Sequence, residues 1–345
     1  MYLSYAEEII DPTAGDAREL SDLAGRAEGA GLTCDLLTIV PLSEPWESEL
    51  PKGHYRSGNS PLEALHDGAR RVSAGEVDAV VIRGVEPLKS GYSRDERHSL
   101  MDIYHGVTIP EGYQLVAEEF LKGMGLSNEW FKDCAEALFD NYLSTYEKRH
   151  LGEAKLPGIR WYQPVTPLFR GVDCANPLID YSGQILLTTA RGASLLGLTE
   201  LVEVEGVGLG EASGDGPENA KEISSFSHLK EAIRLCEAAS GLSIKALMTN
   251  GCCAIELYIC YPVVPLAFIL ASGAVPSVDE VVSYLERQPV TVTGGMNLAR
   301  APWNCPALRA TVAVYREMLE KSLPYGLIHG NGGLGYKQGV AILAR

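Results

Sequence analysis

The chain has 345 residues, of which 46% are apolar, 21% charged and 8% aromatic, a composition that excludes disordered, collagen-like and coiled-coil proteins. Its 29 Lys and Arg against 45 Asp and Glu give a formal net charge of −16, which disfavours nucleic acid and anionic membranes as partners. Because a single core stops growing near ~250–300 residues, we expect two lobes or one two-part domain.

Cysteine usage and the N-terminus indicate a cytoplasmic protein. The eight cysteines include no CxxC pair and form no regular framework, so we expect them to be reduced. MYLSYAEEII lacks the basic start and apolar run of a signal peptide. The uncharged stretch from Leu257 to Val278 contains three prolines and is predicted to be a buried strand and core helix rather than a membrane span. No spacing of Cys and His supports a structural metal.

The periodicity predicts alternating helices and strands. A first group is followed by a polar, helical stretch over about residues 87–160, which we interpret as a lid, and by the Pro-rich connector PGIRWYQPVTP. Further alternation follows the connector. The expected elements are a helix over Asp16–Gly29, a strand in CDLLTIVPL, a helix from Pro61 to near Gly75, a strand in DAVVIRG, a strand and short helix in DYSGQILLTTARGASLLG, a strand in TELVEVEGVGLGEA and one helix in AKEISSFSHLKEAIRLCEAASG.

The end of the chain echoes its first part. In both regions a small residue and a proline open a helix that leads to a short apolar strand ending in glycine. Pro61 precedes Gly84 by 23 residues, and Pro306 precedes Gly330 by 24. This spacing favours a duplicated architecture.

Four segments carry a resemblance to the thiolase superfamily, in the family's order. SAGEVDAVVIRGVEP is similar to the segment after the nucleophile helix, and VTPLFRGVDCANPLIDYSGQILLTTARGA to the central strand. VTVTGGMNLARAPWNCPALRA resembles the segment that contains the GHPxG motif, and GLIHGNGGLGYKQGVAIL resembles the closing Gly-rich strand pair. The sterol-carrier-type and thiolase-like branches are the nearest in pattern.

The resemblance implies an α/β, thiolase-like duplicated fold with two mixed sheets, helices between and outside them, and a helical lid insertion. We expect residues 1–163 to form the first half, including the lid, and residues 164–345 the second. It also implies a coenzyme A thioester as substrate or ligand, with no other cofactor. Family members are commonly dimers or tetramers, so we expect self-association.

The residues at the family's functional positions differ from the family pattern. The nucleophilic cysteine position matches Gly58, or Asn59 with a one-residue shift, and the GHPxG histidine matches Ala301. The asparagine that orients a catalytic water matches Tyr258, and the final catalytic cysteine matches Gly330. Standard cysteine-based acyl transfer is therefore not expected at this site.

Several polar groups near these positions are candidates for chemistry. Tyr258 and His329 could act in acid–base catalysis, although each could equally be a packed structural residue. Cys305 precedes a proline at a predicted helix N-terminus, where a thiol pKa is lowered, or it is a buried inert thiol. The backbone N–H groups of Gly330, Asn331 and Gly332 would line the acyl site, and Lys337 is either an anion contact or a surface lysine.

Three functions are consistent with this pattern. The first is a thiolase-like, acyl-CoA-binding protein related to acetyl-CoA acetyltransferases that makes or breaks C–C bonds with altered cysteine chemistry. The second is a non-catalytic subunit that scaffolds an active thiolase-like or OB-fold partner. The third is a retro-aldolase centred on Tyr258, because thiolase-like retro-aldolases use tyrosine in this region.

Overall fold

The computed structural model describes residues 1–12, 19–150 and 155–345. Within them, strands and helices alternate as the sequence predicts. The strands are β1 (Tyr2–Ile10), β2 (Cys34–Ile39), β3 (His54–Tyr55), β4 (Ala79–Pro87), β5 (Asp180–Thr188), β6 (Val202–Glu211), β7 (Cys253–Glu256), β8 (Tyr325–Gly332) and β9 (Lys337–Ala344). The helices are α1 (Leu23–Gly29), α2 (Ser60–Ser73), α3 (Arg94–Met101), α4 (Ile109–Met124), α5 (Asn128–His150), α6 (Ala190–Leu195), α7 (Ala220–Ile223), α8 (Ser227–Ser240), α9 (Ile244–Thr249), α10 (Val263–Ala271), α11 (Val281–Arg287) and α12 (Pro306–Lys321).

The strands of the described residues form one sheet of nine strands in the order β3-β2-β4-β5-β1-β6-β9-β8-β7. The expectation of two separate sheets is therefore wrong. Antiparallel pairing of Tyr2 with Glu203 and of Leu3 with Val202 joins β1 to β6 and makes the sheet continuous. Sequence patterns within strands could not show this junction, because it depends on which edges meet in space.

The duplication inferred from the helix–strand echo is confirmed by the pairing on the two sides of this junction. The orders β2-β4-β5-β1 and β7-β8-β9-β6 correspond strand for strand. In each set the first two strands are parallel, and the third is antiparallel to both of its neighbours. Helices α2 and α12 occupy equivalent places before β4 and β8. The boundary expected near residue 163 stays a prediction, and β5, which follows it in sequence, pairs with β1 and β4.

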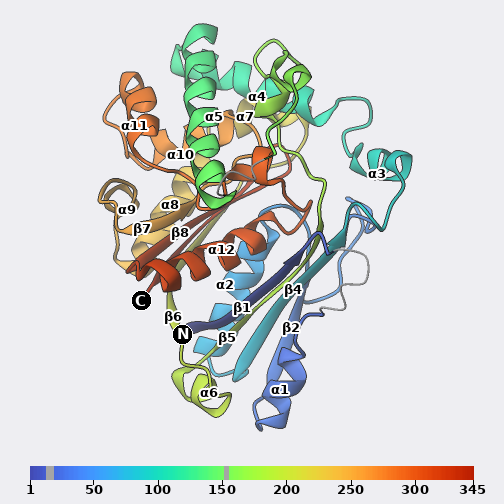
Figure 1. Cartoon of the computed structure of the whole chain (residues 1–345), viewed down its shortest axis with the longest axis vertical. Coiled ribbons are helices and arrows are strands. Elements are labelled where there is room, and N and C mark those ends of the chain that lie inside the picture. Colours follow the sequence, from blue (N-terminus) through green and yellow to red (C-terminus); the bar gives the residue numbers. More distant parts are fainter. Residues whose placement is uncertain (13–18, 151–154) are drawn as a thin grey trace.

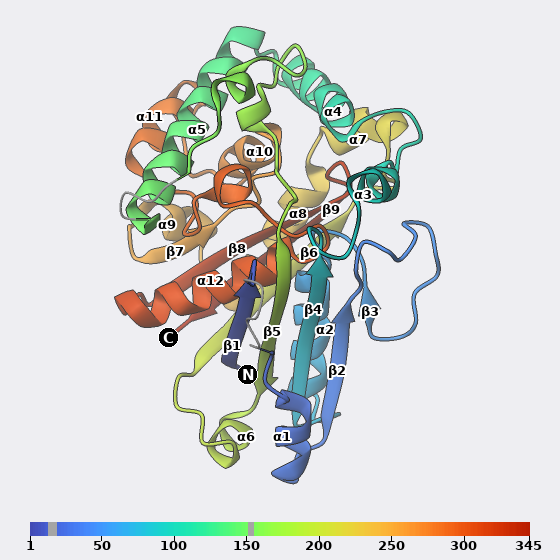
Figure 2. The ribbon, with the colours of Figure 1, turned by 45° about the vertical axis from the view of Figure 1, so that its right-hand side comes forward.

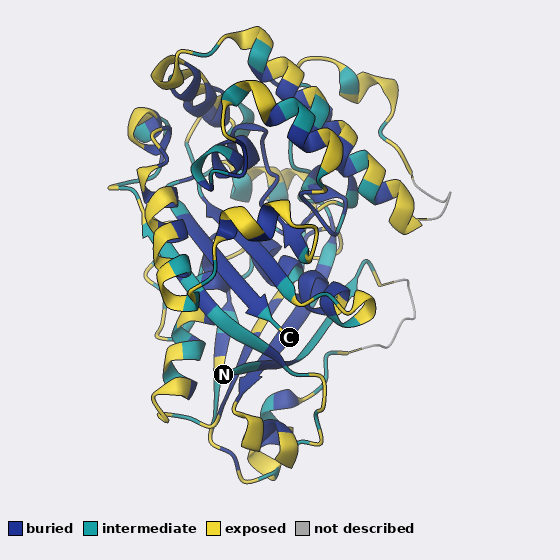
Figure 3. Ribbon diagram, turned by 90° about the vertical axis from the view of Figure 1, so that its left-hand side faces the viewer, coloured by how far each residue is buried: buried dark blue, intermediate teal, exposed yellow. Residues whose placement is uncertain are grey.

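Helices α2 and α12 lie against strands of both sets. Leu62 and Leu65 of α2 and Leu308 and Val312 of α12 are fully buried in one apolar cluster with residues of β1, β4, β5 and β8. The two helices also contact each other. The strands lie between α2 and α12 on one side and the surface helices on the other, and they are buried, whereas the surface helices expose one face (Figure 3). This packing agrees with the expectation of helices between and outside the strands.

The helices of the expected lid gather at one end of the molecule. Figures 1 and 2 show α4 and α5 at the end opposite α1 and α6, with α10 and α11 beside α5. Buried residues of α4, α5, α8, α10 and α11 share a second apolar cluster, so the lid is packed on the body of the protein. Residues 151–154, which fall in the expected lid, lie outside the described residues.

Two predicted helices differ from those observed. Residues 16–18 of the helix expected over Asp16–Gly29 lie outside the described residues, and residues 19–22 are not helical; α1 begins at Leu23 because Asp22 caps it by accepting a hydrogen bond from the Gly25 N–H. The single helix expected over residues 220–241 is two helices, α7 and α8. The break occurs because Phe226 adopts a left-handed conformation, with φ of 47°, and buries its ring.

The uncharged stretch after β7 lies largely in the core, as the sequence predicts, but the buried strand expected at its start is wrong: β7 ends at Glu256, and residues 257–262 are irregular, with the Leu257 N–H donating to the Val290 carbonyl outside the sheet. The stretch contains α10, which is buried from Val263 to Ile269. No helix in the described parts of the chain is both long enough and apolar enough to cross a membrane.

The β1–β6 junction gives a testable stability prediction. Leu3 is fully buried where β1 meets both β5 and β6, so Leu3→Ala should lower the free energy of unfolding by about 2–5 kcal/mol. Leu36→Ala is the control, because that side chain on β2 is 51% exposed and its truncation should cost less than about 1 kcal/mol. Urea unfolding followed by circular dichroism measures both. Equal losses of unfolding free energy in the two variants would contradict the burial of Leu3 at the β1–β6 junction.

Candidate functional site

A cavity of about 170 Å³ lies where the two halves and the lid meet. Most of its wall is apolar or aromatic, as in small-molecule sites. Residues from the start of α2, from α4, from the β7–α10 connection and from the segment before α12 line it. The lining residues are Trp46, Gly58, Met101, Ile103, Tyr104, Ile109, Tyr113, Ala175, Pro177, Tyr258, Cys260, Tyr261, Met296, Pro302, Trp303, Asn304 and Gly333.

Gly58 and Tyr258, two of the predicted site residues, are in direct contact in this cavity. A Cβ atom built on Gly58 would lie 1.9 Å from the Tyr258 hydroxyl and 2.6 Å from the Asn331 carbonyl oxygen. The phenol of Tyr258 therefore fills the space that any side chain at position 58 would need. Gly58 and Tyr258, which the resemblance predicts at the family's nucleophile and asparagine positions, are thus complementary in size.

The Tyr258 hydroxyl is protonated and free to donate a hydrogen bond. Burial raises the pKa of Tyr258 well above its usual value, and Cys260 and the Glu86 carboxyl raise it further. Among the described residues, none forms a hydrogen bond with this hydroxyl. Since Tyr258 lines the cavity, its O–H is available to a ligand there.

A chain of hydrogen bonds runs behind the cavity wall from His329 to Tyr113. The His329 Nδ1 accepts from the Tyr258 backbone N–H at 3.4 Å, so Nε2 carries the proton and donates to the Gln338 Oε1 at 2.7 Å. Gln338 donates to the Asn331 Oδ1 at 2.7 Å, and Asn331 donates to the Tyr113 hydroxyl at 2.8 Å. From His329 onward each group donates to the next, and the chain ends at the Tyr113 hydroxyl, whose residue lines the cavity.

His329 is 1% exposed and does not line the cavity itself. Burial lowers the pKa of His329 to about 4, although its bond to Gln338 opposes the shift, so the imidazole is neutral at pH 7. Its ring also packs on Phe268, with the ring centroids 4.5 Å apart. The contact that His329 makes toward the cavity is therefore its hydrogen bond with the backbone N–H of Tyr258.

Of the other predicted binding residues, Asn59, Gly330, Asn331 and Gly332 lie where the start of α2 meets strands β8 and β9, whereas Ala301 lies in the segment before α12. A Cβ atom on Gly330 would lie 2.6 Å from the Asn59 Oδ1, and one on Gly332 would lie 2.7 Å from the Ser57 Oγ. Ala301 is buried next to Pro302, and its N–H donates to the Asn176 carbonyl. None of these three, nor Asn59 or Asn331, is in the cavity lining. Their role in substrate binding stays a prediction.

Lys337 lies 3.3 Å from the Glu63 carboxylate, in an ion pair between β9 and α2. This ion pair compensates the positive charge of Lys337 without a bound ligand.

Cys305 stands at the N-cap of α12, where the sequence places it, but its environment is unfavourable for a thiolate. It is fully buried, and its sulfur would lie 2.2 Å from a Cβ atom on Gly84. Burial raises the pKa of Cys305 well above its usual value, and the adjacent Glu86 carboxyl raises it further. Cys305 is also absent from the cavity lining.

Two buried carboxyl groups hold the segment 291–305, which carries part of the cavity wall. Glu256, at the end of β7, accepts hydrogen bonds from the backbone N–H groups of Val292 and Thr293. Glu86, near the end of β4, accepts from those of Asn304 and Cys305, each at 2.9 Å. Burial raises the pKa of Glu86 to about 7, although these bonds oppose the shift.

Sequence reasoning missed Cys260 and Tyr113, which both line the cavity. Cys260 donates a hydrogen bond to the Tyr113 hydroxyl at 3.2 Å, and burial raises its pKa to about 12. Cys260 follows Tyr258 by two residues, and this spacing was a usable signal in the sequence. Tyr113 belongs to α4, and only the packing of the lid brings it to the site.

Comparison with solved structures agrees with this architecture. A monomeric SCP2-thiolase-like protein type 1 from Mycobacterium smegmatis matches with a TM-score of 0.70 and 18% identity, over 99% of this chain and 76% of that one. The fold is thiolase-like. Human mitochondrial 3-ketoacyl-CoA thiolase matches with a TM-score of 0.64 and 14% identity, over 99% and 98% of the two chains. An Ltp2–ChsH2(DUF35) aldolase matches with a TM-score of 0.66 and 14% identity, over 99% and 97%.

No protein-family model and no curated protein matches the sequence. The likeness to solved structures confirms the fold that the resemblance implied, and the site residues give the evidence on chemistry.

The Gly58–Tyr258 contact gives a second prediction. Gly58→Ala should lower the free energy of unfolding by about 1–3 kcal/mol, because the added methyl group must displace the Tyr258 ring or the chain at Asn331. Gly123→Ala in α4 is the matched control. Since no atom lies within 4 Å of a Cβ at that position, the same change should be neutral or stabilise by up to about 1 kcal/mol. If urea unfolding shows a change of the same sign in the free energy of unfolding of both variants, the contact between Gly58 and Tyr258 is contradicted.

The buried His329 and Glu86 give a prediction on pH. The pKa of His329 is about 4 in the folded protein against 6.5 in the unfolded chain, so its contribution to stability is lost as the pH falls from about 6.5 to 4. The pKa of Glu86 is about 7 against 4.5, so its contribution is lost as the pH rises from about 4.5 to 7.

His329→Gln should therefore gain stability relative to the wild type as the pH falls, and Glu86→Gln should gain as the pH rises. Urea unfolding between pH 4.5 and 7 measures the two slopes. Curves that stay parallel to that of the wild type would show that neither pKa is shifted by folding.

Proposed function

We propose that this protein makes or breaks a C–C bond of an acyl-CoA thioester by aldol-type chemistry, without a cysteine nucleophile. The observation that carries the proposal is the Tyr258 hydroxyl. It occupies the position that a side chain at residue 58 would take, and it faces the cavity without a hydrogen-bond partner among the described residues.

Tyr258 would exchange one proton with the β-oxygen of the substrate. In the direction of bond formation, an enolate carbon attacks a carbonyl carbon, the carbonyl π electrons move to oxygen, and that oxygen takes the phenol proton. In the direction of cleavage, the β-hydroxyl returns the proton to the phenolate as the C–C bond breaks into a carbonyl and an enolate. Because burial favours the neutral phenol, Tyr258 is best suited to the proton-donating direction.

The cysteines near the site do not favour acyl transfer. A thiolate is the nucleophile in such chemistry, and burial raises the pKa of Cys260 to about 12 and raises that of Cys305 well above its usual value. Cys260 lines the cavity, but its S–H donates to Tyr113. An acyl-CoA ligand is supported by the likeness to a 3-ketoacyl-CoA thiolase, and aldol chemistry by the likeness to an aldolase.

The proposal includes an accessory subunit as a partner. The aldolase that matches in structure is named as a pairing of two components, Ltp2 and ChsH2(DUF35). An OB-fold or thiolase-like partner of this chain would complete the substrate site, and self-association stays a separate prediction.

The test is Tyr258→Phe, assayed by release of the carbonyl product from a β-hydroxyacyl-CoA and by the reverse condensation. Loss of the phenol proton should lower kcat by about 100-fold or more while acyl-CoA still binds. Tyr284→Phe is the control, because its buried hydroxyl donates to the Met248 carbonyl away from the cavity, and its kcat should stay near that of the wild type.

Unchanged turnover in Tyr258→Phe would overturn the proposal. An acyl-cysteine adduct on Cys260 or Cys305, detected by mass spectrometry after incubation with acyl-CoA, would favour acyl transfer instead. Absence of any turnover, alone or with a co-purified subunit, would favour a non-catalytic scaffold.

A further inference from the structure

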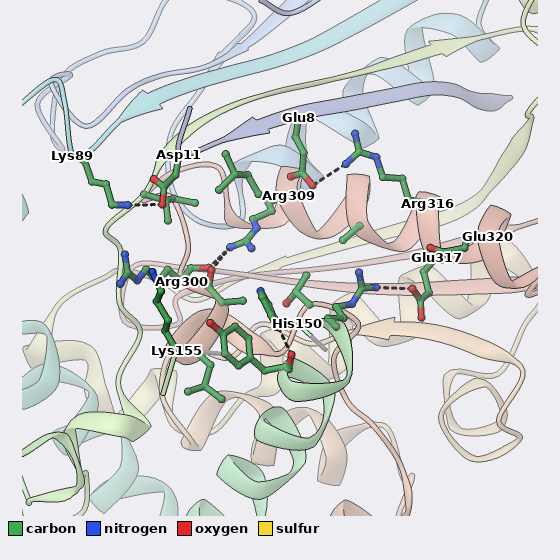
Figure 4. A pocket seen from close by; sticks show the side chains of 18 residues that line it. Glu8, Asp11, Lys89, His150, Lys155, Arg300, Arg309, Arg316, Glu317 and Glu320 are labelled. Carbon is green, nitrogen blue, oxygen red and sulfur yellow. Dashed lines mark hydrogen bonds and ion pairs between the residues drawn. The ribbon is translucent and has the colours of Figure 1, made fainter. Parts of the chain in front are cut away.

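A second cavity, of about 750 Å³, also borders the segment 291–305 but is lined by different residues of it. Its walls come from the end of β1, the C-terminal end of α5, the turn at Leu298–Arg300 and one face of α12 (Figure 4). The volume falls within the range of small-molecule sites and far exceeds that of a single inorganic ion.

The charge of this cavity is opposite in sign to that of the whole chain. Six Lys and Arg side chains line it against four Asp and Glu, although the chain as a whole has 29 against 45. The cations are Lys89, Arg149, Lys155, Arg300, Arg309 and Arg316. The acids are Glu8, Asp11, Glu317 and Glu320.

Three of the cations are neutralised within the wall. Lys89 pairs with Asp11, Arg149 with Glu317, and Arg316 with Glu8. Arg300, Arg309 and Lys155 form no ion pair with any carboxylate of the described residues, and Glu320 is the one acid in the lining that remains unpaired there. Figure 4 shows Arg300 and Lys155 on the side of Lys89, opposite Glu317 and Glu320. Two of the three cations without an ion pair, Arg300 and Lys155, therefore lie at one end of the cavity.

Arg309 fixes the backbone that carries Arg300. Its guanidinium donates to the carbonyl oxygens of Ala299 and Arg300, at the end of the π-helix Gly295–Ala299. These bonds use one nitrogen of the guanidinium, and its other N–H groups can bind a ligand. Arg300 has φ of 61° and ψ of 175°, a conformation that a residue with a Cβ atom adopts only at an energetic cost. Arginine therefore stands at a position whose backbone conformation favours glycine.

We propose that this cavity binds a phosphate-bearing small molecule, with the guanidinium groups of Arg300 and Arg309 on the phosphate oxygens and the Lys155 ammonium as a third positive charge. Arginine forks match the geometry of phosphate oxygens and form strong charge-assisted hydrogen bonds. The size of the cavity favours a diphosphate or larger molecule over orthophosphate. This site is separate from the Tyr258 cavity and does not depend on the proposed C–C bond chemistry.

The test is isothermal titration calorimetry at low ionic strength with two probes, inorganic pyrophosphate and ADP. Both should bind the wild-type protein, and Arg300→Gln and Lys155→Gln should each weaken binding by about 10-fold or more. Arg191→Gln and Lys230→Gln are matched controls, because both residues are exposed and neither lines this cavity, and binding should be unchanged. Tyr258→Phe should also bind as the wild type does.

Arg300→Gly separates binding from folding. It should lose affinity as Arg300→Gln does while its unfolding midpoint rises, because glycine adopts a positive φ without strain. Tighter binding of ADP than of pyrophosphate would identify a larger phosphorylated molecule as the ligand. Equal affinity for the two probes would identify a free anion as the ligand. Absence of saturable binding of both probes, or wild-type affinity in Arg300→Gln, would overturn the proposal.

Discussion

The close approach of α2 to the ends of β8 and to the Tyr258 loop is the constraint on which the site depends. Gly58, Gly330 and Gly332 stand where a single methyl group would meet a neighbour at less than 3 Å. The approach brings the start of α2 against β8 and leaves the Tyr258 hydroxyl facing the cavity beside them. A site with this geometry has no room for a side chain at residue 58, so its chemistry must come from the opposite wall.

Buried polar groups then fix that wall. Glu86 belongs to the first set of strands and Glu256 to the second, and each binds one end of the segment 291–305 through backbone N–H groups. Because unpaired backbone donors are costly in a buried site, removal of either carboxyl would loosen the segment that both cavities share. His329 acts in the same way on the backbone at Tyr258. The three groups form hydrogen bonds with the main chain. These bonds explain why the groups are buried, and no direct part in the chemistry is needed to explain it.

The sequence predicted what depends on local pattern and failed where distant edges meet. Helices α2 and α12 were found because a proline and an apolar stripe mark their starts, and Gly58 and Tyr258 because short motifs place them. The junction of β1 with β6 has no local signal, so two sheets were expected in place of one. Tyr113 comes to the site through lid packing, and the break at Phe226 requires a backbone conformation that phenylalanine rarely adopts. The environment of Cys305 depended on Glu86, which is 219 residues distant in sequence.

The position of β1 has a consequence for how the protein matures during synthesis. This strand comprises residues 2–10, yet its partners are β5, at residues 180–188, and the start of β6. Synthesis must therefore pass residue 180 before β1 can pair with β5. Contacts of such wide sequence separation slow folding and leave strand edges open in the meantime. The acidic residues Glu7 and Glu8 on this strand would help to keep the waiting segment from pairing with other chains.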